Sequence, residues 1–234
     1  MAGRAFVGTS GFAYPEWKGS FYPPGLPGTR LLAFYAERLP SVEINYTFRR
    51  EPSPKVIDAW RSATPDEFRF AIKASMRITH LWPLDPPDEV LTGFLDAVQP
   101  LGERLGPMLF QTGPRFALDA DRLQRFLDRV PEGIASAFEF RHPSWEEARP
   151  LLEERGAAWC ASETEASPIE ELPSGPFLYL RLRRPDYDEA SLDAWAGRLQ
   201  PVLKQGRDAF VFFKHEGGDE GPAWAGRLAA ALRS

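Results

Sequence analysis

Short apolar runs alternate with longer amphipathic runs along most of the chain. The short runs are rich in β-branched and aromatic residues, a composition that favours strands. Eight of these runs are predicted to be strands: Ala5–Gly8, Ser41–Asn45, Arg69–Lys73, Met108–Gln111, Ser136–Phe140, Ala157–Ala161, Phe177–Leu182 and Ala209–Phe213.

The segments between these runs carry the spacing of amphipathic helices. After Pro87, acidic residues suit the positive end of a helix dipole, and apolar residues recur with a helical period over Val90–Leu101. The same pattern starts near Asp121 and again at Leu192. Between the sixth and seventh runs, the segment around Ser167–Leu172 predicts no more than a turn of helix.

This alternation predicts a (β/α)₈ barrel of the TIM type, as a single domain over residues 1–234. Eight strand–crossover units in 234 residues average about 29 residues each, which suits a compact barrel. A doubly wound open sheet is the alternative. No G-x-G-x-x-G or G-x-x-x-x-G-K-[ST] string follows a predicted strand, so the nucleotide-binding versions of that sheet lack their signature.

Composition and charge exclude few functional classes. The net charge is −5, so a nucleic-acid partner would need a local basic patch. A single cysteine, Cys160, excludes a disulfide framework and a cysteine-based zinc cluster. No run reaches the ~18 consecutive apolar residues of a membrane span, and the first residues lack the apolar stretch of a secretory signal. We therefore expect a cytoplasmic protein with no membrane partner.

Several local strings add a more specific signal than periodicity. The main ones are Gly8–Tyr14 with Trp17, Val42–Arg49, Phe68–Lys73 and Phe138–Trp145. Together these strings resemble the YecE-like family of bacterial proteins of unknown function. The resemblance implies a TIM-type barrel with an internal cavity at the strand ends and no established biochemical activity.

The last third of the chain departs from the pattern of that family. The string Arg181–Arg184 stands where the family typically has Arg-x-His-Gly, and Phe213–His215 stands where it has Phe-Asn-Asn. The resemblance therefore gives less guidance to the site on strands six to eight than on the earlier strands.

Polar side chains recur at the predicted strand ends. In a TIM-type barrel the carboxyl ends of the strands form the working face, and alternation along each strand turns one set of side chains inward. The inward-facing residues near these ends are Glu43, Asn45, Lys73, Gln111, Glu139, Arg141, Arg181, Arg183 and Lys214, with Thr9 or Ser10 ending the first strand. The sequence therefore predicts a polar cavity at one end of the barrel.

We expect Glu43, Glu139 and Lys73 to be the catalytic groups of this cavity. Carboxylates act as acid and base when their surroundings separate their pKa values, and arginine forks bind phosphate or carboxylate in a bidentate manner. The expected substrate-binding residues are Asn45, Gln111, Arg141, His142, Arg181, Lys214, Tyr14 and Trp17. The alternative is a buried ion-pair network that only fills the barrel interior.

Four classes of function remain open. The favoured class is a metal-independent enzyme of hydrolase or lyase type, without a cofactor, that acts on a small anionic substrate bearing phosphate or carboxylate. The second is a nucleic-acid-binding barrel, related in shape to barrel endonucleases, with Arg49, Arg50, Arg77 and Arg183 along a groove. The others are a glycosidase built on the two carboxylates and a non-catalytic ligand-binding protein.

The histidines and the glycine-rich segment give weaker signals. No H-E-x-x-H string or close ligand spacing appears, so no metal is expected. His142 precedes a proline, where helix capping is an equal alternative to substrate binding. His80 lies in a loop that can reach the barrel mouth, and His215 lies beside Lys214. The segment Gly217–Pro222 is a candidate phosphate-binding turn before the last helix.

The first loop is crowded with aromatic residues. They are Phe12, Tyr14, Trp17, Phe21 and Tyr22. Such rings either stack on a ligand ring or pack the loop against the barrel, and the second alternative is the commoner one.

Overall fold

The strands of this protein form a closed barrel. The computed structural model describes residues 2–214 and 218–233. All neighbouring strands are parallel and follow chain order, and β1 pairs with both β2 and β8. The strands are β1 (Ala5–Ser10), β2 (Ser41–Ile44), β3 (Arg69–Lys73), β4 (Leu105–Gln111), β5 (Ser136–Glu139), β6 (Ala158–Glu163), β7 (Leu178–Leu182) and β8 (Ala209–Lys214). This arrangement confirms the predicted (β/α)₈ barrel.

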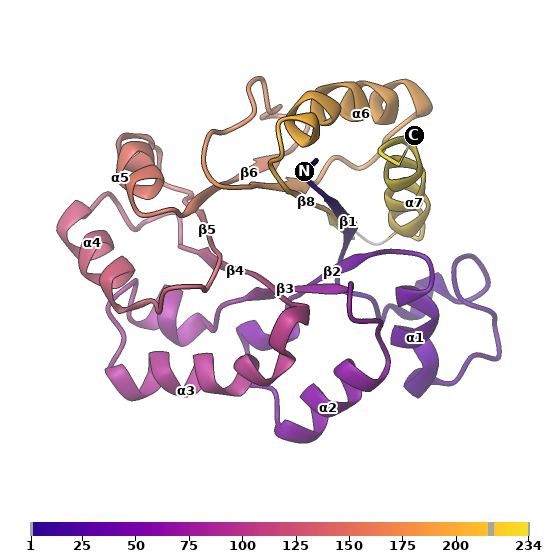
Figure 1. Ribbon diagram of the computed structural model, residues 1–234, viewed down its shortest axis with the longest axis horizontal. Coiled ribbons are helices and arrows are strands. Elements are labelled where there is room, and N and C mark those ends of the chain that lie inside the picture. The colour runs from indigo at the N-terminus through magenta and orange to yellow at the C-terminus, as the bar shows by residue number, and fades with distance from the viewer. Residues whose placement is uncertain (1, 215–217, 234) are drawn as a thin grey trace.

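Helices surround the strands, as the view down the barrel in Figure 1 shows. The α-helices are α1 (Leu31–Ala36), α2 (Pro54–Ser62), α3 (Asp88–Val98), α4 (Ala120–Arg129), α5 (Arg149–Glu154), α6 (Glu189–Lys204) and α7 (Gly221–Ala231). Shorter helical segments are Pro15–Trp17, Gly28–Arg30, Tyr46–Phe48, Arg77–Leu81, Gln99–Arg104 and Pro143–Ala148. The fully described connection from β6 to β7 contains no helix, which agrees with its weak pattern.

The first strand extends beyond its predicted end. Thr9 and Ser10 continue β1 past Gly8 because they pair with Phe213 and Lys214 of β8. Both strands therefore reach further toward the carboxyl end of the barrel than their apolar runs indicated.

Other predicted boundaries also differ from the structure, by one or two residues at the ends of β2, β5, β6 and β7 and by more at β4 and α3. Strand β4 begins at Leu105 rather than Met108, because Leu105 pairs with Phe70 before a register shift in the β3–β4 ladder. Helix α3 ends at Val98, so Leu101 belongs to the short helical segment that follows and not to the stripe of α3.

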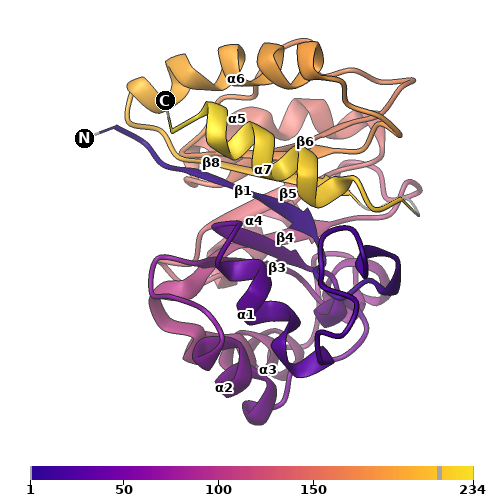
Figure 2. The same ribbon diagram turned by 90° about the vertical axis from the view of Figure 1, so that its right-hand side faces the viewer.

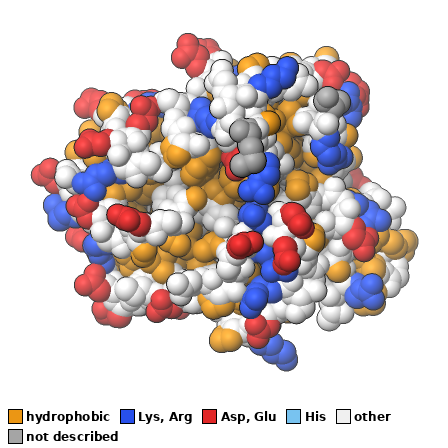
Figure 3. All heavy atoms as spheres, in the orientation of Figure 1, with side chains coloured by type: hydrophobic (Ala, Val, Ile, Leu, Met, Phe, Trp, Pro, Cys, Tyr) orange, Lys and Arg blue, Asp and Glu red, His pale blue; other side chains and the backbone are white. Residues whose placement is uncertain are grey.

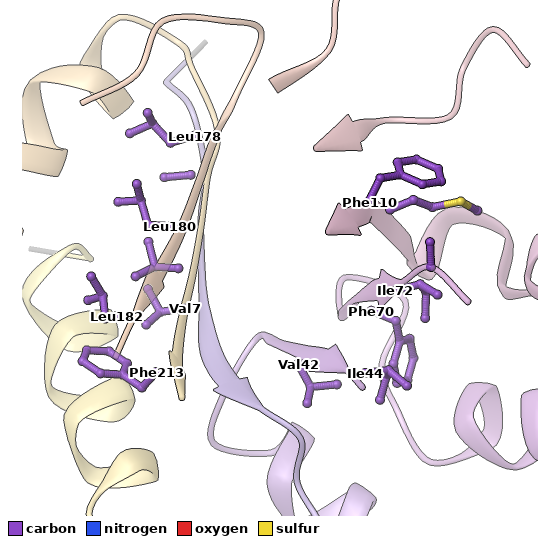
Figure 4. Close-up of a cluster of buried hydrophobic side chains, with 14 of the residues drawn as sticks. Val7, Val42, Ile44, Phe70, Ile72, Phe110, Leu178, Leu180, Leu182 and Phe213 are labelled. Carbon is purple, nitrogen blue, oxygen red and sulfur yellow. The ribbon is translucent and has the colours of Figure 1, made fainter. Parts of the chain in front are cut away.

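The apolar core has two layers, one on each side of the strands. Between strands and helices lie outward-facing side chains such as Val7, Val42 and Phe110, which Figure 4 shows. The inner layer fills the barrel and consists of Phe6, Ala71, Leu109, Ala137, Ala158, Cys160, Phe177, Tyr179, Phe210 and Phe212. Because side chains alternate along a strand, the next inward positions toward the strand ends carry the polar groups described below.

The end of the barrel at which the strands begin is closed by aromatic rings. Phe6 and Phe210 stack there with centroids 4.6 Å apart. A cavity of about 340 Å³ at this end has Arg4, Arg69 and Asp208 in its wall. Figure 3 shows this face, with Lys and Arg side chains in a line across its middle. In Figure 2 the strands run from this end toward the opposite one, where the candidate site lies.

Candidate functional site

Arg181 of β7 joins two glutamates inside the carboxyl end of the barrel. Its Nη1 donates to Glu139 Oε2 at 2.6 Å, and its Nη2 donates to Glu43 Oε1 at 2.9 Å. The three side chains come from β7, β5 and β2, and all are buried. Burial alone would lower the pKa of Arg181, but the two carboxylates outweigh burial and raise the pKa well above its usual value. Arg181 therefore stays charged and holds both carboxylates.

Four hydrogen bonds occupy the Glu43 carboxylate. Its Oε1 accepts from Ser10 Oγ, from Asn45 Nδ2 at 3.2 Å and from Arg181. Its Oε2 accepts from the Tyr179 hydroxyl at 2.9 Å. Burial favours the neutral acid, but Arg181 and the hydroxyls of Ser10 and Tyr179 lower the pKa of Glu43 below its usual value. These donors favour the ionised carboxylate. The catalytic role expected for Glu43 stays a prediction.

Glu139 is held by two arginines. Its Oε2 binds Arg181 and lies 4.0 Å from Cys160 Sγ, while its Oε1 accepts from Arg141 Nε at 3.4 Å. Burial again opposes ionisation, but Arg181 and then Arg141 lower the pKa of Glu139. Both carboxylates are therefore ionised at neutral pH. A glycosidase needs one carboxylic acid with a raised pKa, so the lowered pKa values of Glu43 and Glu139 do not favour that alternative.

Lys73, the last residue of β3, titrates closer to neutral pH than an ordinary lysine. Its Nζ donates to Gln111 Oε1 at 2.8 Å and lies 4.3 Å from the ring centroid of Phe48. Burial and then the charge of Arg181 lower the pKa of Lys73 to about 8, against the opposing effect of the two carboxylates. Near that pH the amine is present in both protonation states, so Lys73 can exchange a proton with a ligand.

The charged group at the barrel mouth has an excess of positive charge. Lys73, Arg141 and Arg181 face two carboxylates, which leaves one positive charge among these five side chains. The Arg141 side chain is 40% exposed, whereas Arg181 is buried. A positive charge in a site partly shielded from water favours a nearby anion. Anion binding at this site stays a prediction.

His80 adds a second titratable group beside Lys73. Its ring packs edge-on against Phe48 with centroids 5.1 Å apart, and its Nδ1 lies 2.9 Å from Thr79 Oγ1. Burial, followed by the charges of Lys73 and Arg141, lowers the pKa of His80. The imidazole is therefore neutral at neutral pH. The loop after β3 thus brings His80 to the barrel mouth.

Three contributors to this site were not predicted in their present roles. Ser10 and Tyr179 donate to Glu43, and Phe48 packs against Lys73. Strand alternation predicted the inward positions of Ser10 and Tyr179, but not their hydrogen bonds to Glu43. Phe48 ends the short helical segment after β2, where no periodic pattern marks it.

Trp17 and His142 make packing and capping contacts. Trp17 is fully buried, packs against Tyr14 with centroids 4.9 Å apart, and donates from Nε1 to the backbone oxygen of Gly218 at 3.3 Å. His142 Nδ1 accepts from the backbone N–H of Ser144 at 3.3 Å, so His142 caps the helical segment Pro143–Ala148. The substrate-binding roles expected for these two residues stay predictions.

Tyr14 and Lys214 lie at the same rim as Glu43. The Tyr14 hydroxyl donates to the backbone oxygen of Ser10 at 2.6 Å. Burial, followed by the charge of Glu43, raises the pKa of Tyr14. Lys214 ends β8 in register with Ser10, whose side chain binds Glu43. The structure therefore brings these two predicted residues to the carboxyl end of the barrel.

The arginines expected along a nucleic-acid groove lie in segments that follow the carboxyl ends of β2, β3 and β7. Arg49 and Arg50 are exposed after β2, and Arg183 follows β7. Arg77 forms an ion pair with Glu51 at 3.7 Å. These positions leave nucleic-acid binding a prediction.

A grouped set of metal ligands and a membrane-spanning helix are both absent from the part of the chain that the structure describes. Within residues 2–214 and 218–233, no three His, Cys, Asp or Glu side chains are grouped to hold a metal ion. In the same ranges, no helix combines the length and the apolar character needed to cross a bilayer. His215 and part of the segment Gly217–Pro222 lie outside the described residues. The absence of a metal and a cytoplasmic location stay predictions.

A family model described as "Protein of unknown function DUF72" matches residues 6–234. The chain belongs to this DUF72 family. The UPF0759 protein YecE of Escherichia coli (strain K12) is 32% identical over 144 residues, which cover 60% of this chain and 49% of YecE. The match thus spans about half the length of that relative. These findings confirm the predicted resemblance to the YecE-like family.

Two further comparisons extend over nearly the whole of this DUF72 chain. The UPF0759 protein YunF of Bacillus subtilis (strain 168) is 23% identical over 257 residues, covering 92% of this chain and 90% of YunF. The crystal structure of a DUF72 family protein from Thermotoga maritima MSB8 superimposes with a TM-score of 0.86 at 24% identity, covering 99% of this chain and 100% of that chain. The structural similarity shows a shared fold, and neither relative's name specifies a reaction.

Proposed function

We propose that this DUF72 protein is a metal-independent enzyme of hydrolase or lyase type that acts on a small phosphate- or carboxylate-bearing compound. The observation that supports the proposal most directly is the positive charge left over among Lys73, Arg141 and Arg181 after both buried glutamates are paired. This charge lies at the carboxyl end of a (β/α)₈ barrel, where the enzymes that share this architecture place their active sites.

Arg141 and Lys73 have different roles in this proposal. Arg141 is partly exposed, and its guanidinium offers the fork geometry that suits phosphate or carboxylate. Lys73 exchanges the proton, because its pKa of about 8 is closer to neutral pH than the lowered pKa values of Glu43 and Glu139. The two glutamates and Arg181 form the anchor that keeps the site in place.

Binding of inorganic phosphate, measured by isothermal titration calorimetry at low salt, tests the anion site. The wild type is expected to bind phosphate, and Arg141→Met is expected to bind at least about tenfold more weakly, the equivalent of ~1.4 kcal/mol. Lys204→Met is the matched control, because Lys204 is an exposed cation in the last turn of α6. Failure of both inorganic phosphate and acetate to bind the wild type, or an equal loss in the control, would contradict the proposed site.

Hydrolysis or elimination of phosphate and carboxylate esters tests the enzymatic part. Lys73→Arg keeps the positive charge but cannot give up a proton near neutral pH. We therefore expect this variant to bind phosphate as the wild type does and to lose turnover. Phosphate binding without turnover of any ester by the wild type would favour a non-catalytic binding protein.

A further inference from the structure

An apolar cleft opens beside the charged group, at the same end of the barrel. Its volume is about 390 Å³. Phe12 and Tyr14 of the β1–α1 loop form one wall, Tyr46 lies just after β2, and Val56 and Trp60 of α2 form another wall. The cleft is therefore bounded by segments that all follow or flank the carboxyl ends of β1 and β2.

Two residues connect the cleft to the charged group. Asn45 lines the cleft, and its Nδ2 donates to Glu43 Oε1 at 3.2 Å. Tyr14 also lines the cleft, and its hydroxyl donates to the backbone oxygen of Ser10, whose Oγ binds the same Glu43 oxygen. Through Asn45 and Tyr14 the cleft therefore lies directly beside Glu43 of the charged group.

The lining of the cleft indicates what part of a ligand it receives. None of the described residues that line it is charged, so it suits an uncharged group. Four of them carry aromatic rings, which favour a planar ring through offset or edge-to-face contacts. Its volume exceeds the ~150 Å³ of an apolar cavity that accepts benzene and lies within the usual range of ligand pockets. The Tyr46 side chain at its edge is 44% exposed and available for contact.

We propose that this cleft binds an aromatic ring of the same ligand whose phosphate or carboxylate binds at Arg141 and Lys73. This inference rests on the proposed function and narrows its substrate class to aromatic anions. Asn45 then lies at the junction of the two parts, with its amide between the ring and the buried carboxylate.

Calorimetry with a matched set of ligands tests this inference. Inorganic phosphate and phenyl phosphate carry the same anionic group, acetate and phenylacetate form the carboxylate pair, and phenol supplies the ring alone. We expect one aromatic anion to bind at least about tenfold more tightly than its counterpart without the ring. The pair that shows this gain identifies phosphate or carboxylate as the anionic group.

Substitutions within the cleft distinguish binding of the aromatic ring from binding of the anionic group. Val56→Phe fills the cleft from α2. We expect this variant to bind the aromatic anion at least about tenfold more weakly than the wild type, whereas its affinity for inorganic phosphate stays within about twofold. Val202→Phe is the matched control, because Val202 is also half-buried on a helix but lies on α6. Tyr46→Ala, at an exposed position, repeats the test with little risk to folding.

Three outcomes would overturn the inference while leaving the proposed function intact. The first is an aromatic anion that binds no more tightly than phosphate or acetate. The second is an equal effect of Val56→Phe on ligands with and without the ring. The third is phenol binding as tightly as phenyl phosphate, which would make the cleft an independent apolar site. Failure of inorganic phosphate and acetate to bind the wild type at all would instead refute the proposed function.

Discussion

Arg181 is the residue on which both buried carboxylates depend. Glu43 and Glu139 are 0% and 4% exposed, and each binds one terminal nitrogen of the same guanidinium. Removing one partner of a buried ion pair leaves an uncompensated charge, which costs much more than the pair itself contributes.

Arg181→Met is therefore expected to lower the free energy of unfolding by about 3–5 kcal/mol near neutral pH. Urea denaturation followed by circular dichroism measures the change. Arg141→Met is the control, because its side chain is 40% exposed and pairs with Glu139 at the surface of the site. The expected effect of the control is below about 1 kcal/mol. Similar losses in the two variants would contradict the central role of Arg181.

The pH dependence of the Arg181→Met effect identifies its cause. The pKa values of Glu43 and Glu139 are lowered in the folded protein, so their contribution is fully present above the unfolded pKa of about 4.3. That contribution is lost as pH falls through the folded pKa values. The stability difference between wild type and Arg181→Met should shrink over this acidic window. A difference that stays constant down to acidic pH would indicate lost packing instead of lost ion pairing.

At this scale the sequence predicted which side chains face inward but not how they pair. Alternation along β2, β5 and β7 correctly placed Glu43, Glu139 and Arg181 in the barrel. Which side chains then meet depends on the stagger of the strands around the barrel, which one sequence does not give. The expectation that the two glutamates act as acid and base did not include their shared arginine, and that arginine lowers both pKa values.

The β1–α1 loop shows how an element shapes the site. Gly11 has a φ of +87°, a backbone conformation that is strained for any residue with a side chain. A Cβ added at Gly11 would lie 2.5 Å from the Tyr14 hydroxyl. Gly19 in the same loop has a φ of +95°, but nothing lies within 4 Å of its added Cβ. The two positions share backbone strain and differ in the contact with Tyr14.

Both Gly11→Ala and Gly19→Ala are expected to introduce backbone strain of roughly 1 kcal/mol. Gly11→Ala is expected to destabilise the protein more, because its added methyl group also displaces Tyr14. Thermal unfolding measures stability, and phenyl phosphate binding reports on the cleft. Gly19→Ala should leave binding close to that of the wild type. Equal effects of the two substitutions on binding would show that Tyr14 does not depend on the space left by Gly11.

The predictability of each element follows from its length. Helices α3, α4 and α6 span 11, 10 and 16 residues, enough turns to display their period in the sequence. Helices α1 and α5 span six residues each, which is less than two turns, and their patterns are too short to be recognised. Observed strand ends differ from the predicted ones where a neighbouring strand continues the ladder, as β8 does for β1 at Ser10. The sequence around one strand does not show such pairing, because the partner strand is distant in the sequence.

The whole molecule combines a net charge of −5 with a locally positive barrel mouth. Overall charge therefore gives no guide to the ligand, whereas the groups that converge at one end of the barrel do. The order of strands and crossovers was predictable because one alternation runs through the chain. The reaction was not predictable, because barrels of this type support many chemistries through their strand ends and loops.

The titration of Lys73 by nuclear magnetic resonance, in protein with ¹³C-labelled lysine side chains, tests the account most directly. We expect the pKa of Lys73 to be about 8 without added anion. We also expect this pKa to increase on addition of inorganic phosphate, because a nearby anion favours the charged amine, and not to increase with chloride at the same ionic strength. A Lys73 that titrates near the usual lysine value of about 10.4 and does not respond to phosphate would contradict the account.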